Sequence, residues 1–280
     1  MLIKLMAAAG AAATALTVLL TDLAGRGADL IWICPLLLLG FFLAANVLYV
    51  VLMFIICSCT ISLEKPNDKP SPFWEWSLEA IADWLYFWCR LKVHVSGMEK
   101  LPECRFLMVC NHRSLFDPVS KIPIFKNIGM VYVSKPSNFK IPIAGKLMHA
   151  YGCLSLNRDN NREALVTIKR AAEIISSDKA SVCIYPEGTR SKREKLLPFH
   201  AGSFKIAQKA SCPVVAVTVH GSDTVGKNFP FRHTHIYVDV TEVFDAETVK
   251  SKTTSELAEM AQKIVQDKYD EFENKEQAEC

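Results

Sequence analysis

Residues 30–63 contain no charged side chain and are rich in Leu, Ile, Val and Phe. A helix needs about 20 apolar residues to cross the hydrocarbon core of a bilayer, and this run is longer than that. A buried helix of a soluble domain is the alternative, but soluble core helices are usually shorter. Because Pro35 lies near the start of the run, we expect the helix to extend from Leu36 to about Cys59. The chain is therefore predicted to enter a membrane.

A second apolar run, dominated by alanine, occupies residues 5–21 and follows Lys4. Its positive start and small residues are typical of a signal peptide, but it could equally form the first arm of a helical hairpin. Lys4 precedes the two runs and Lys65 and Lys69 follow them, and basic residues prefer the cytoplasmic side of a membrane. We favour a membrane hairpin over residues 1–63 with both ends in the cytoplasm. A shallow hairpin confined to one monolayer remains open.

Residues 64–92 differ in composition from the apolar region before them. Prolines and charges crowd into residues 64–72, as is typical of a linker. The segment that follows holds four of the five tryptophans of the chain, which are Trp74, Trp76, Trp84 and Trp88. Tryptophan favours the headgroup layer of a bilayer, so we predict a helix at an anionic membrane surface. Packing of the same rings on the globular domain is the alternative, and both can hold on different faces of one helix.

Residues 93–280 alternate strand-like and helix-like runs, which predicts one α/β domain with a mixed sheet flanked by helices. The expected strands are residues 93–96, 106–110, 130–134, 153–156, 181–185, 213–220 and 235–243. The expected helices lie near residues 118–124, 142–151, 162–177, 201–210 and 254–273.

Charge and cysteine usage exclude some classes of function. The net charge of +3 is too mild to indicate a nucleic-acid partner, although it is compatible with anionic lipid. The ten cysteines include no Cys-x-x-Cys pair, so we expect neither a zinc site nor a disulfide framework. A reduced domain that faces the cytosol fits this pattern.

The segment from Asn111 to Asp117 follows a strand-like run and places a histidine and a carboxylate five residues apart. A positioned imidazole can take the proton of an alcohol, and such transfer typically contributes about a hundredfold to ten-thousandfold in rate. Asp117 could orient His112 and stabilise its charged form, with Asp117-Pro118 at the start of a helix. The alternative is an ordinary loop histidine beside a helix cap.

The segment from Tyr185 to Arg190 also follows a strand-like run, and it sets Glu187 and Arg190 around Gly188. A guanidinium can bind a phosphate through two hydrogen bonds, and glycine allows the backbone to approach an anion closely. Lys192, Arg193 and Lys195 add further positive charge. A solvated basic turn is the alternative for this segment taken alone.

Taken together and in this order, these segments resemble the glycerolipid acyltransferase family, specifically the 1-acyl-sn-glycerol-3-phosphate acyltransferases. Two departures from the family pattern are Ala216, where a second proline is usual, and His200, where lysine is common. The four matching blocks are Asn111-His112 with Asp117, the stretch from Lys135 through Gly152 to Arg158, Tyr185 to Arg190, and Pro213 to Val217.

The resemblance implies the glycerolipid-acyltransferase fold and a reaction. An acyl group passes from an acyl thioester, on coenzyme A or acyl carrier protein, to the free hydroxyl of 1-acyl-sn-glycerol-3-phosphate, giving phosphatidic acid. His112 would act as the base and Asp117 would orient it, without a cofactor or metal. Arg190, with Arg158 as a second candidate, would hold the acceptor phosphate. The further substrate-site residues that the resemblance implies are Lys135, Glu187, Gly188 and Thr189.

Several alternatives remain open at this stage. The acceptor could be glycerol-3-phosphate, another lysophospholipid or lyso-ornithine lipid, and water as acceptor would make the protein a hydrolase. A non-catalytic lipid-binding membrane protein is a further alternative.

No Gly-x-Ser-x-Gly elbow is present, and we interpret Cys110 as a buried structural thiol. Residues 221–227 have phosphate-loop spacing but lack the final hydroxyl, so we predict a plain loop. The bacterial inner membrane and the endoplasmic reticulum both fit the pattern.

Overall fold

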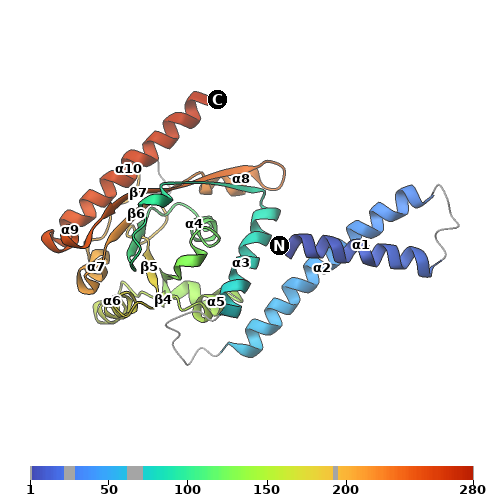
Figure 1. The fold of residues 1–280 in the computed structure, drawn as a ribbon, viewed down its shortest axis with the longest axis horizontal. Helices are drawn as coiled ribbons and strands as arrows, with labels where there is room; N and C mark the ends of the chain where they lie inside the picture. The colour runs from blue at the N-terminus through green and yellow to red at the C-terminus, as the bar shows by residue number, and fades with distance from the viewer. Residues whose placement is uncertain (1, 22–28, 62–71, 192–194, 280) are drawn as a thin grey trace. The chain divides into compact units, whose positions relative to one another are not determined.

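The computed structural model describes residues 2–21, 29–61, 72–191 and 195–279, with side chains up to residue 275 (Figure 1). The chain forms two compact units, Met1–Ser62 and Leu63–Cys280. The connection of the predicted hairpin at residues 22–28, most of the predicted linker, and Lys192 and Arg193 lie outside the described residues.

The first unit consists of helices α1 (Leu2–Leu20) and α2 (Leu30–Thr60), which pack against each other. The buried residues of α1 are Met6, Gly10 and Thr14, spaced four apart and therefore on one face. Both helices are long and apolar enough to cross a membrane, and little of either is buried. These two apolar helices indicate membrane association.

Helix α2 begins at Leu30, so the prediction that Pro35 breaks or starts it is wrong. Pro35 is only the sixth residue of the helix, where its missing N–H removes one hydrogen bond, to the carbonyl of Ile31. The long apolar run on both sides outweighs that loss, as is common in membrane helices.

The second unit is built on a seven-stranded sheet with strand order β1-β7-β6-β2-β5-β3-β4. All neighbouring strands are parallel except the pair β6 and β7, which confirms the predicted mixed sheet. The strands are β1 (Leu91–Ser96), β2 (Leu107–Cys110), β3 (Met130–Ser134), β4 (Leu154–Ser155), β5 (Ser181–Ile184), β6 (Val214–His220) and β7 (Thr234–Phe244).

Helices cover both faces of this sheet, which explains why the central strands are continuous apolar runs without alternation. Side chains of α6, α7, α9 and α10 join one core with alternate residues of the strands, and side chains of α3, α4 and α8 join the other (Figure 1). The helices of this unit are α3 (Pro72–Trp88), α4 (Phe116–Lys121), α5 (Ala144–Ala150), α6 (Asn161–Ser176), α7 (Lys205–Ala210), α8 (Val225–Asn228), α9 (Ala246–Ser251) and α10 (Thr254–Glu279). Short 3₁₀ turns are η2 (Met98–Lys100), η3 (Lys126–Ile128), η4 (Pro136–Lys140), η5 (Ala201–Phe204) and η6 (Ser222–Thr224).

Helix α3 carries the tryptophan-rich segment and has two different faces. Leu78 and Tyr86 pack on the core, and the Tyr86 hydroxyl donates to the carbonyl oxygen of Ser120 at 2.6 Å. Phe73, Trp76 and Phe87 form a stripe on another face and are 46–48% exposed. The core-packing alternative therefore holds for one face, and the membrane-surface interpretation remains a prediction for the exposed stripe.

Two local predictions are wrong. Helix α4 begins at Phe116, two residues before Pro118, and hydrogen bonds hold the residues at its start: the Ser114 hydroxyl accepts from the N–H of Phe116, and Asp117 accepts from the N–H of Ser114. Residues 222–228 are helical, as η6 followed by α8, rather than a plain loop. The Thr224 hydroxyl donates to the carbonyl of Gly221 and closes that first turn.

Candidate active site

The predicted site residues gather at one edge of the sheet, where five parallel strands end. Ligand sites of α/β sheets form at the carboxyl ends of their parallel strands. His112 lies just after β2, the turn 185–190 just after β5, and Lys135 just after β3. Arg158 follows β4, and Ser222 follows β6.

His112 and Asp117 are paired, as the spacing predicts. The Nδ1 atom of His112 lies 2.8 Å from Oδ2 of Asp117. A carboxylate oxygen can only accept, so this contact places the imidazole proton on Nδ1 and leaves the lone pair on Nε2. The Asp117 side chain is fully buried, whereas that of His112 is 21% exposed. The pair therefore offers a proton acceptor to a molecule arriving from outside.

Asp117 is held by a set of donors that the sequence did not reveal in full. Its Oδ2 also accepts from the backbone N–H groups of Arg113, at 2.8 Å, and Ser114, at 2.7 Å. Its Oδ1 accepts from the hydroxyl of Ser222, which follows β6 and lies in the segment interpreted as a plain loop. These donors fix the orientation of the Asp117 carboxyl group beside His112.

Asn111 and Glu187 fix the backbone of the histidine loop. The amide of Asn111 continues the sheet, because its Nδ2 donates to the carbonyl of Val219 and its Oδ1 accepts from the N–H of Val219, both at 2.8 Å. Glu187 Oε1 accepts from the N–H of His112 at 2.6 Å, and its Oε2 accepts from the N–H of Leu197 at 2.8 Å. Glu187 thus ties together the loops that follow β2 and β5.

Burial raises the pKa of Glu187 to about 7, and its hydrogen bonds from the N–H groups of His112 and Leu197 oppose that shift. The residue as a whole is 3% exposed. Glu187 therefore titrates near neutral pH inside the hydrogen-bond network that positions His112.

Two features require glycine at position 188: its backbone conformation and the lack of space for a side chain. Its φ is +74°, a region that glycine adopts without strain, and the Arg158 guanidinium occupies the position where a side chain would begin. Arg158 Nη2 also donates to the carbonyl of Tyr185 at 3.3 Å. The structure thus brings Arg158, which is 27 residues away from Tyr185, against the turn that holds Glu187.

The ring of Tyr185 forms the wall beside His112, with ring centroids 4.3 Å apart. The Nζ atom of Lys121 lies 4.3 Å from the centroid of the same tyrosine ring and is itself fully buried. Cys110, interpreted as a structural thiol, is also fully buried. Nothing in the sequence pattern indicates the burial of Lys121, because a lysine at the end of a short helix is usually solvated.

Thr189 and Arg190 are exposed, as is Lys135 at the carboxyl end of β3. Since β3 is adjacent to β5 on the side away from β2, Lys135 is farther along the sheet edge from His112 than the turn is. Among the residues that the structure describes, no cluster of three His, Cys, Asp or Glu side chains suits a metal ion.

A family model described as "Acyltransferase" matches residues 92–220. A chloroplastic 1-acyl-sn-glycerol-3-phosphate acyltransferase of Brassica napus is 36% identical over 138 residues, which are 48% of this chain and 39% of that protein. The 1-acyl-sn-glycerol-3-phosphate acyltransferase of Saccharomyces cerevisiae is 34% identical over 137 residues, 48% of this chain and 45% of that protein. The matched segment thus spans less than half of each of these relatives.

The fold agrees with the crystal structure of a 1-acyl-sn-glycerophosphate acyltransferase from Thermotoga maritima, with a TM-score of 0.57 and 24% identity over 71% of this chain and 79% of that one. These matches bear out the resemblance drawn from the four sequence blocks: residues 92–220 match the acyltransferase model, and about half of the chain is similar to 1-acyl-sn-glycerol-3-phosphate acyltransferases.

Proposed function

We propose that the protein transfers an acyl group from an acyl thioester to the free hydroxyl of 1-acyl-sn-glycerol-3-phosphate and so makes phosphatidic acid. The observation that carries this proposal is the contact of His112 Nδ1 with Asp117 Oδ2 at 2.8 Å, which leaves Nε2 as the proton acceptor. Relatives that match about half of this chain are named as 1-acyl-sn-glycerol-3-phosphate acyltransferases, which supports the proposal.

In the proposed reaction, Nε2 of His112 takes the proton of the acceptor hydroxyl as the oxygen attacks the thioester carbonyl carbon. Asp117 stabilises the resulting imidazolium. The tetrahedral intermediate then collapses, the carbon–sulfur bond breaks, and the imidazolium returns its proton to the leaving thiolate. The new ester and a free thiol are the products, and His112 is again neutral. No acyl-enzyme forms, so no serine or cysteine nucleophile takes part.

For the acceptor, we propose that Arg190 binds the phosphate, with Arg158 as the second candidate. Arg190 is exposed at the end of the turn that begins beside His112, so it can reach a bound molecule. Glu187 positions the turn through its two hydrogen bonds. The remaining members of the proposed substrate site are Gly188, Thr189 and Lys135.

We further propose that residues 1–63 form the membrane hairpin, residues 64–92 the linker and membrane-surface helix, and residues 93–280 the catalytic domain on the cytosolic side. The support is the apolar length of α1 and α2 and the half-exposed stripe of Phe73, Trp76 and Phe87 on α3. An acceptor that is itself a bilayer lipid requires a site at headgroup depth, and such a stripe would hold the domain there.

The proposal is tested with the full-length protein in detergent or vesicles. Purified protein is given each of four acceptors, lysophosphatidic acid, glycerol-3-phosphate, another lysophospholipid and lyso-ornithine lipid, with acyl-CoA or acyl carrier protein as donor. The expected result is labelled phosphatidic acid from lysophosphatidic acid. Free fatty acid as the main product would indicate a hydrolase, and no turnover with any pair would contradict the transferase assignment.

Arg190→Ala tests the phosphate contact. The apparent KM for lysophosphatidic acid should rise by about tenfold or more, because a charge-assisted hydrogen bond contributes roughly 1.5–3 kcal/mol. The KM for the acyl donor should change little. Lys195→Ala, at another exposed basic residue of the same loop, is the matched control. A rise confined to the donor would assign Arg190 to the thioester instead.

A further inference from the structure

Two phenylalanines project from the loop between α8 and β7, residues 229–233, which we call the phenylalanine loop. Phe229 is 51% exposed and Phe231 is 87% exposed, the highest value among the large apolar side chains of the described residues. Single exposed apolar side chains are common on soluble proteins, so the surroundings of these two rings decide what they indicate.

The phenylalanine loop lies at the same edge of the sheet as the candidate active site. Strands β6 and β2 are parallel, so the carboxyl end of β6 is at the edge where the histidine loop begins, and β7 returns antiparallel to β6. At the start of this connection, the Ser222 hydroxyl donates to Asp117, and Asp223 accepts from Arg113. The chain thus passes from the support of the catalytic pair through α8 to Phe229.

The carboxyl-terminal end of α3 meets the same connection. The carbonyl of Arg90, just after α3, accepts from the N–H of Thr234, the first residue of β7, at 3.1 Å. The Arg90 guanidinium donates to Nε2 of His233 at 3.0 Å. Phe87, in the last turn of α3, belongs to the exposed stripe of that helix. The stripe and the phenylalanine loop therefore approach one junction of the fold (Figure 1).

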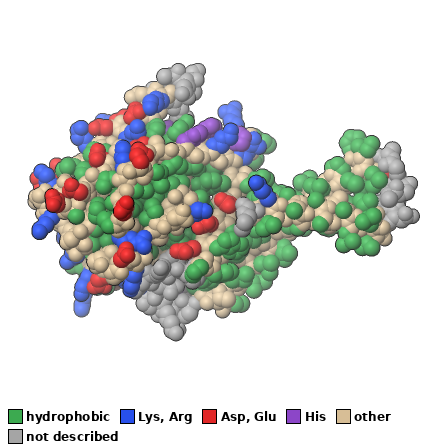
Figure 2. All heavy atoms as spheres, in the orientation of Figure 1, with side chains coloured by type: hydrophobic (Ala, Val, Ile, Leu, Met, Phe, Trp, Pro, Cys, Tyr) green, Lys and Arg blue, Asp and Glu red, His purple; other side chains and the backbone are tan. Residues whose placement is uncertain are grey.

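The surface around this junction is basic. Its two segments, residues 84–98 and 224–238, contain no acidic residue, although the whole chain has 29. Figure 2 shows Lys, Arg and His side chains gathered over β1 and the start of β7, at the upper edge of the view. The Lys and Arg residues of the two segments are exposed, and they are Arg90, Lys92, Lys227 and Arg232.

Exposed aromatic rings within a basic surface are complementary to an anionic bilayer. The rings can enter the boundary between headgroups and acyl chains, and the basic side chains can contact the phosphates above it. Because the phenylalanine loop and the catalytic pair share one edge of the sheet, insertion of the loop would bring His112 toward the layer that holds a lipid acceptor.

We propose that the phenylalanine loop inserts its two rings into an anionic bilayer, with Arg90, Lys227 and Arg232 at the headgroups, and so turns the catalytic edge of the sheet toward the membrane. This contact is separate from the apolar helices α1 and α2, and it adds to the one proposed for α3. The inference rests on the proposed placement of the catalytic domain at a membrane and not on the acyl-transfer chemistry.

The depth of the loop is measured with the full-length protein in phosphatidylglycerol-containing vesicles whose lipids carry bromine on the acyl chains. Phe231→Trp adds one tryptophan to the loop, and the fluorescence of the parent protein is subtracted. We expect the added tryptophan to lose most of its emission to the brominated lipid. A tryptophan added by Leu165→Trp should keep its emission.

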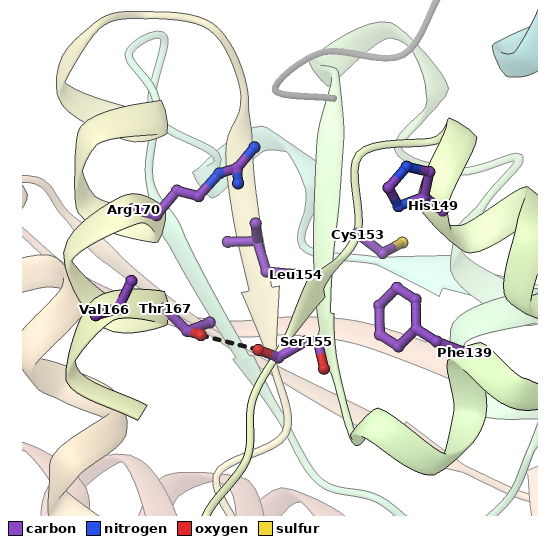
Figure 3. A pocket seen from close by; sticks show the side chains of 8 residues that line it. All are labelled: Phe139, His149, Cys153, Leu154, Ser155, Val166, Thr167 and Arg170. Atoms are coloured by element: carbon purple, nitrogen blue, oxygen red, sulfur yellow. Dashed lines mark hydrogen bonds between the residues drawn. The ribbon is translucent and has the colours of Figure 1, made fainter. Parts of the chain in front are cut away.

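The control position lies on α6, whose side chains join the core on the opposite face of the sheet. Leu165 and Val166 are 52% and 64% exposed, as apolar side chains comparable to those of the loop. Val166 lines a hollow of about 260 Å³ that also contains Phe139 and His149 (Figure 3). None of the residues that line this hollow belongs to the catalytic pair or to the phenylalanine loop.

Activity gives a second measurement. The double variant Phe229→Ala, Phe231→Ala should lower turnover of vesicle-embedded lysophosphatidic acid by about tenfold or more, because two apolar rings no longer enter the bilayer. Turnover of a short-chain, water-soluble acceptor should stay within about twofold. The matched double variant Leu165→Ala, Val166→Ala should resemble the parent on both acceptors.

The basic residues are tested by charge reversal. Lys227→Glu, Arg232→Glu should lower turnover by about tenfold or more on vesicles that contain phosphatidylglycerol, and much less on phosphatidylcholine alone. High salt should reduce the difference between the two kinds of vesicle. Lys209→Glu, Lys250→Glu, at exposed lysines of α7 and α9, is the matched control.

Three results would overturn the inference. An unquenched tryptophan at position 231, in vesicles where the difference between the parent and Trp76→Phe shows quenching of Trp76, would leave α3 as the contact and exclude the loop. Equal quenching at positions 231 and 165 would exclude a preferred orientation. Equal loss on both acceptors in the phenylalanine variant would assign the rings to the fold. Quenching requires no turnover, so it decides the role of the loop even if the parent transfers no acyl group.

Discussion

The two units of this chain use apolar residues in opposite ways. In the α/β unit, the strands β2, β5 and β6 are wholly buried, and charged side chains gather on its surface (Figure 2). In the helical pair, the buried residues of α1 include the small Gly10 and Thr14, while Leu19 and Leu20 are about three-quarters exposed. A unit with small residues inside and large apolar residues outside is suited to lipid rather than water. The buried ionisable groups Asp117 and Glu187 lie in the α/β unit, where loop N–H groups supply their hydrogen bonds.

The strongest test of this division is His112→Ala. Acyl transfer should fall by about a hundredfold to ten-thousandfold, because the proton acceptor is lost. The unfolding temperature and the membrane extraction of the protein should be unchanged, since the imidazole is partly exposed. Leu19→Ala, at an exposed residue of α1, is the control and should keep its activity. Near-normal turnover of His112→Ala would show that the base lies elsewhere.

A smaller effect is expected at the exposed stripe of α3. The double variant Trp76→Ala, Phe87→Ala should lower activity on vesicle-embedded lysophosphatidic acid by about tenfold or more, since burial of each large apolar side chain contributes roughly 1.5–3 kcal/mol. Activity on a short-chain, water-soluble acceptor should be retained. Replacing the buried Ala80 by Gly in the same helix should lower stability and affect both acceptors alike. Equal loss on both acceptors in the double variant would mean that the stripe supports the fold, not the membrane contact.

Within the helical pair, Gly10 and Gly40 form a matched pair of positions. A Cβ at Gly10 would lie 3.4 Å from the backbone nitrogen of Phe42, whereas a Cβ at Gly40 would meet nothing within 4 Å. Gly10→Leu should therefore separate the helices and cost about 1–3 kcal/mol, while Gly40→Leu should cost little. Cross-linking efficiency between cysteines placed on α1 and α2 measures the separation. Equal cross-linking in both variants would contradict packing through Gly10.

The smallest effect concerns pH. The pKa of Glu187 is raised to about 7 in the folded protein, above its ordinary 4.5, so the folded state binds this proton more tightly than the unfolded chain does. That contribution to the free energy of unfolding is complete below about pH 4.5 and is lost as the pH rises to about 7. Unfolding temperatures of the α/β unit should fall over this range, and Glu187→Gln should flatten the fall. Helix α2, which has no charged residue, should show no such slope. A slope that persists in Glu187→Gln would assign the titration to another group.

Much of this architecture could be predicted because the signals are local. The central strands are apolar runs buried on both faces. His112 and Asp117 are only five residues apart, so their spacing predicts the contact between them. The hydroxyl that completes the Asp117 site belongs to Ser222, 105 residues away, and only the arrangement of β2 beside β6 brings the two together. A local sequence pattern cannot predict such a contact.

The errors have the same origin. Pro35 predicts a helix break from its own geometry, but the apolar residues before it continue the helix. Pro118 predicts itself as the first helical residue from its fixed φ, but helix α4 begins two residues earlier, at Phe116.

The unequal lengths of α1 and α2 have a consequence for the host membrane. At 1.5 Å per residue, α1 is about 28 Å long and α2 about 46 Å, whereas a hydrocarbon core is about 30 Å thick. Because Gly10 is level with Leu38 and Phe42, the excess lies in the last turns of α2. A membrane-spanning α1 would need little adjustment, whereas a membrane-spanning α2 would have to tilt or raise those turns into the headgroups. Bilayer thickness would then act on α2 and not on α1, so this helical pair would distinguish thick membranes from thin ones.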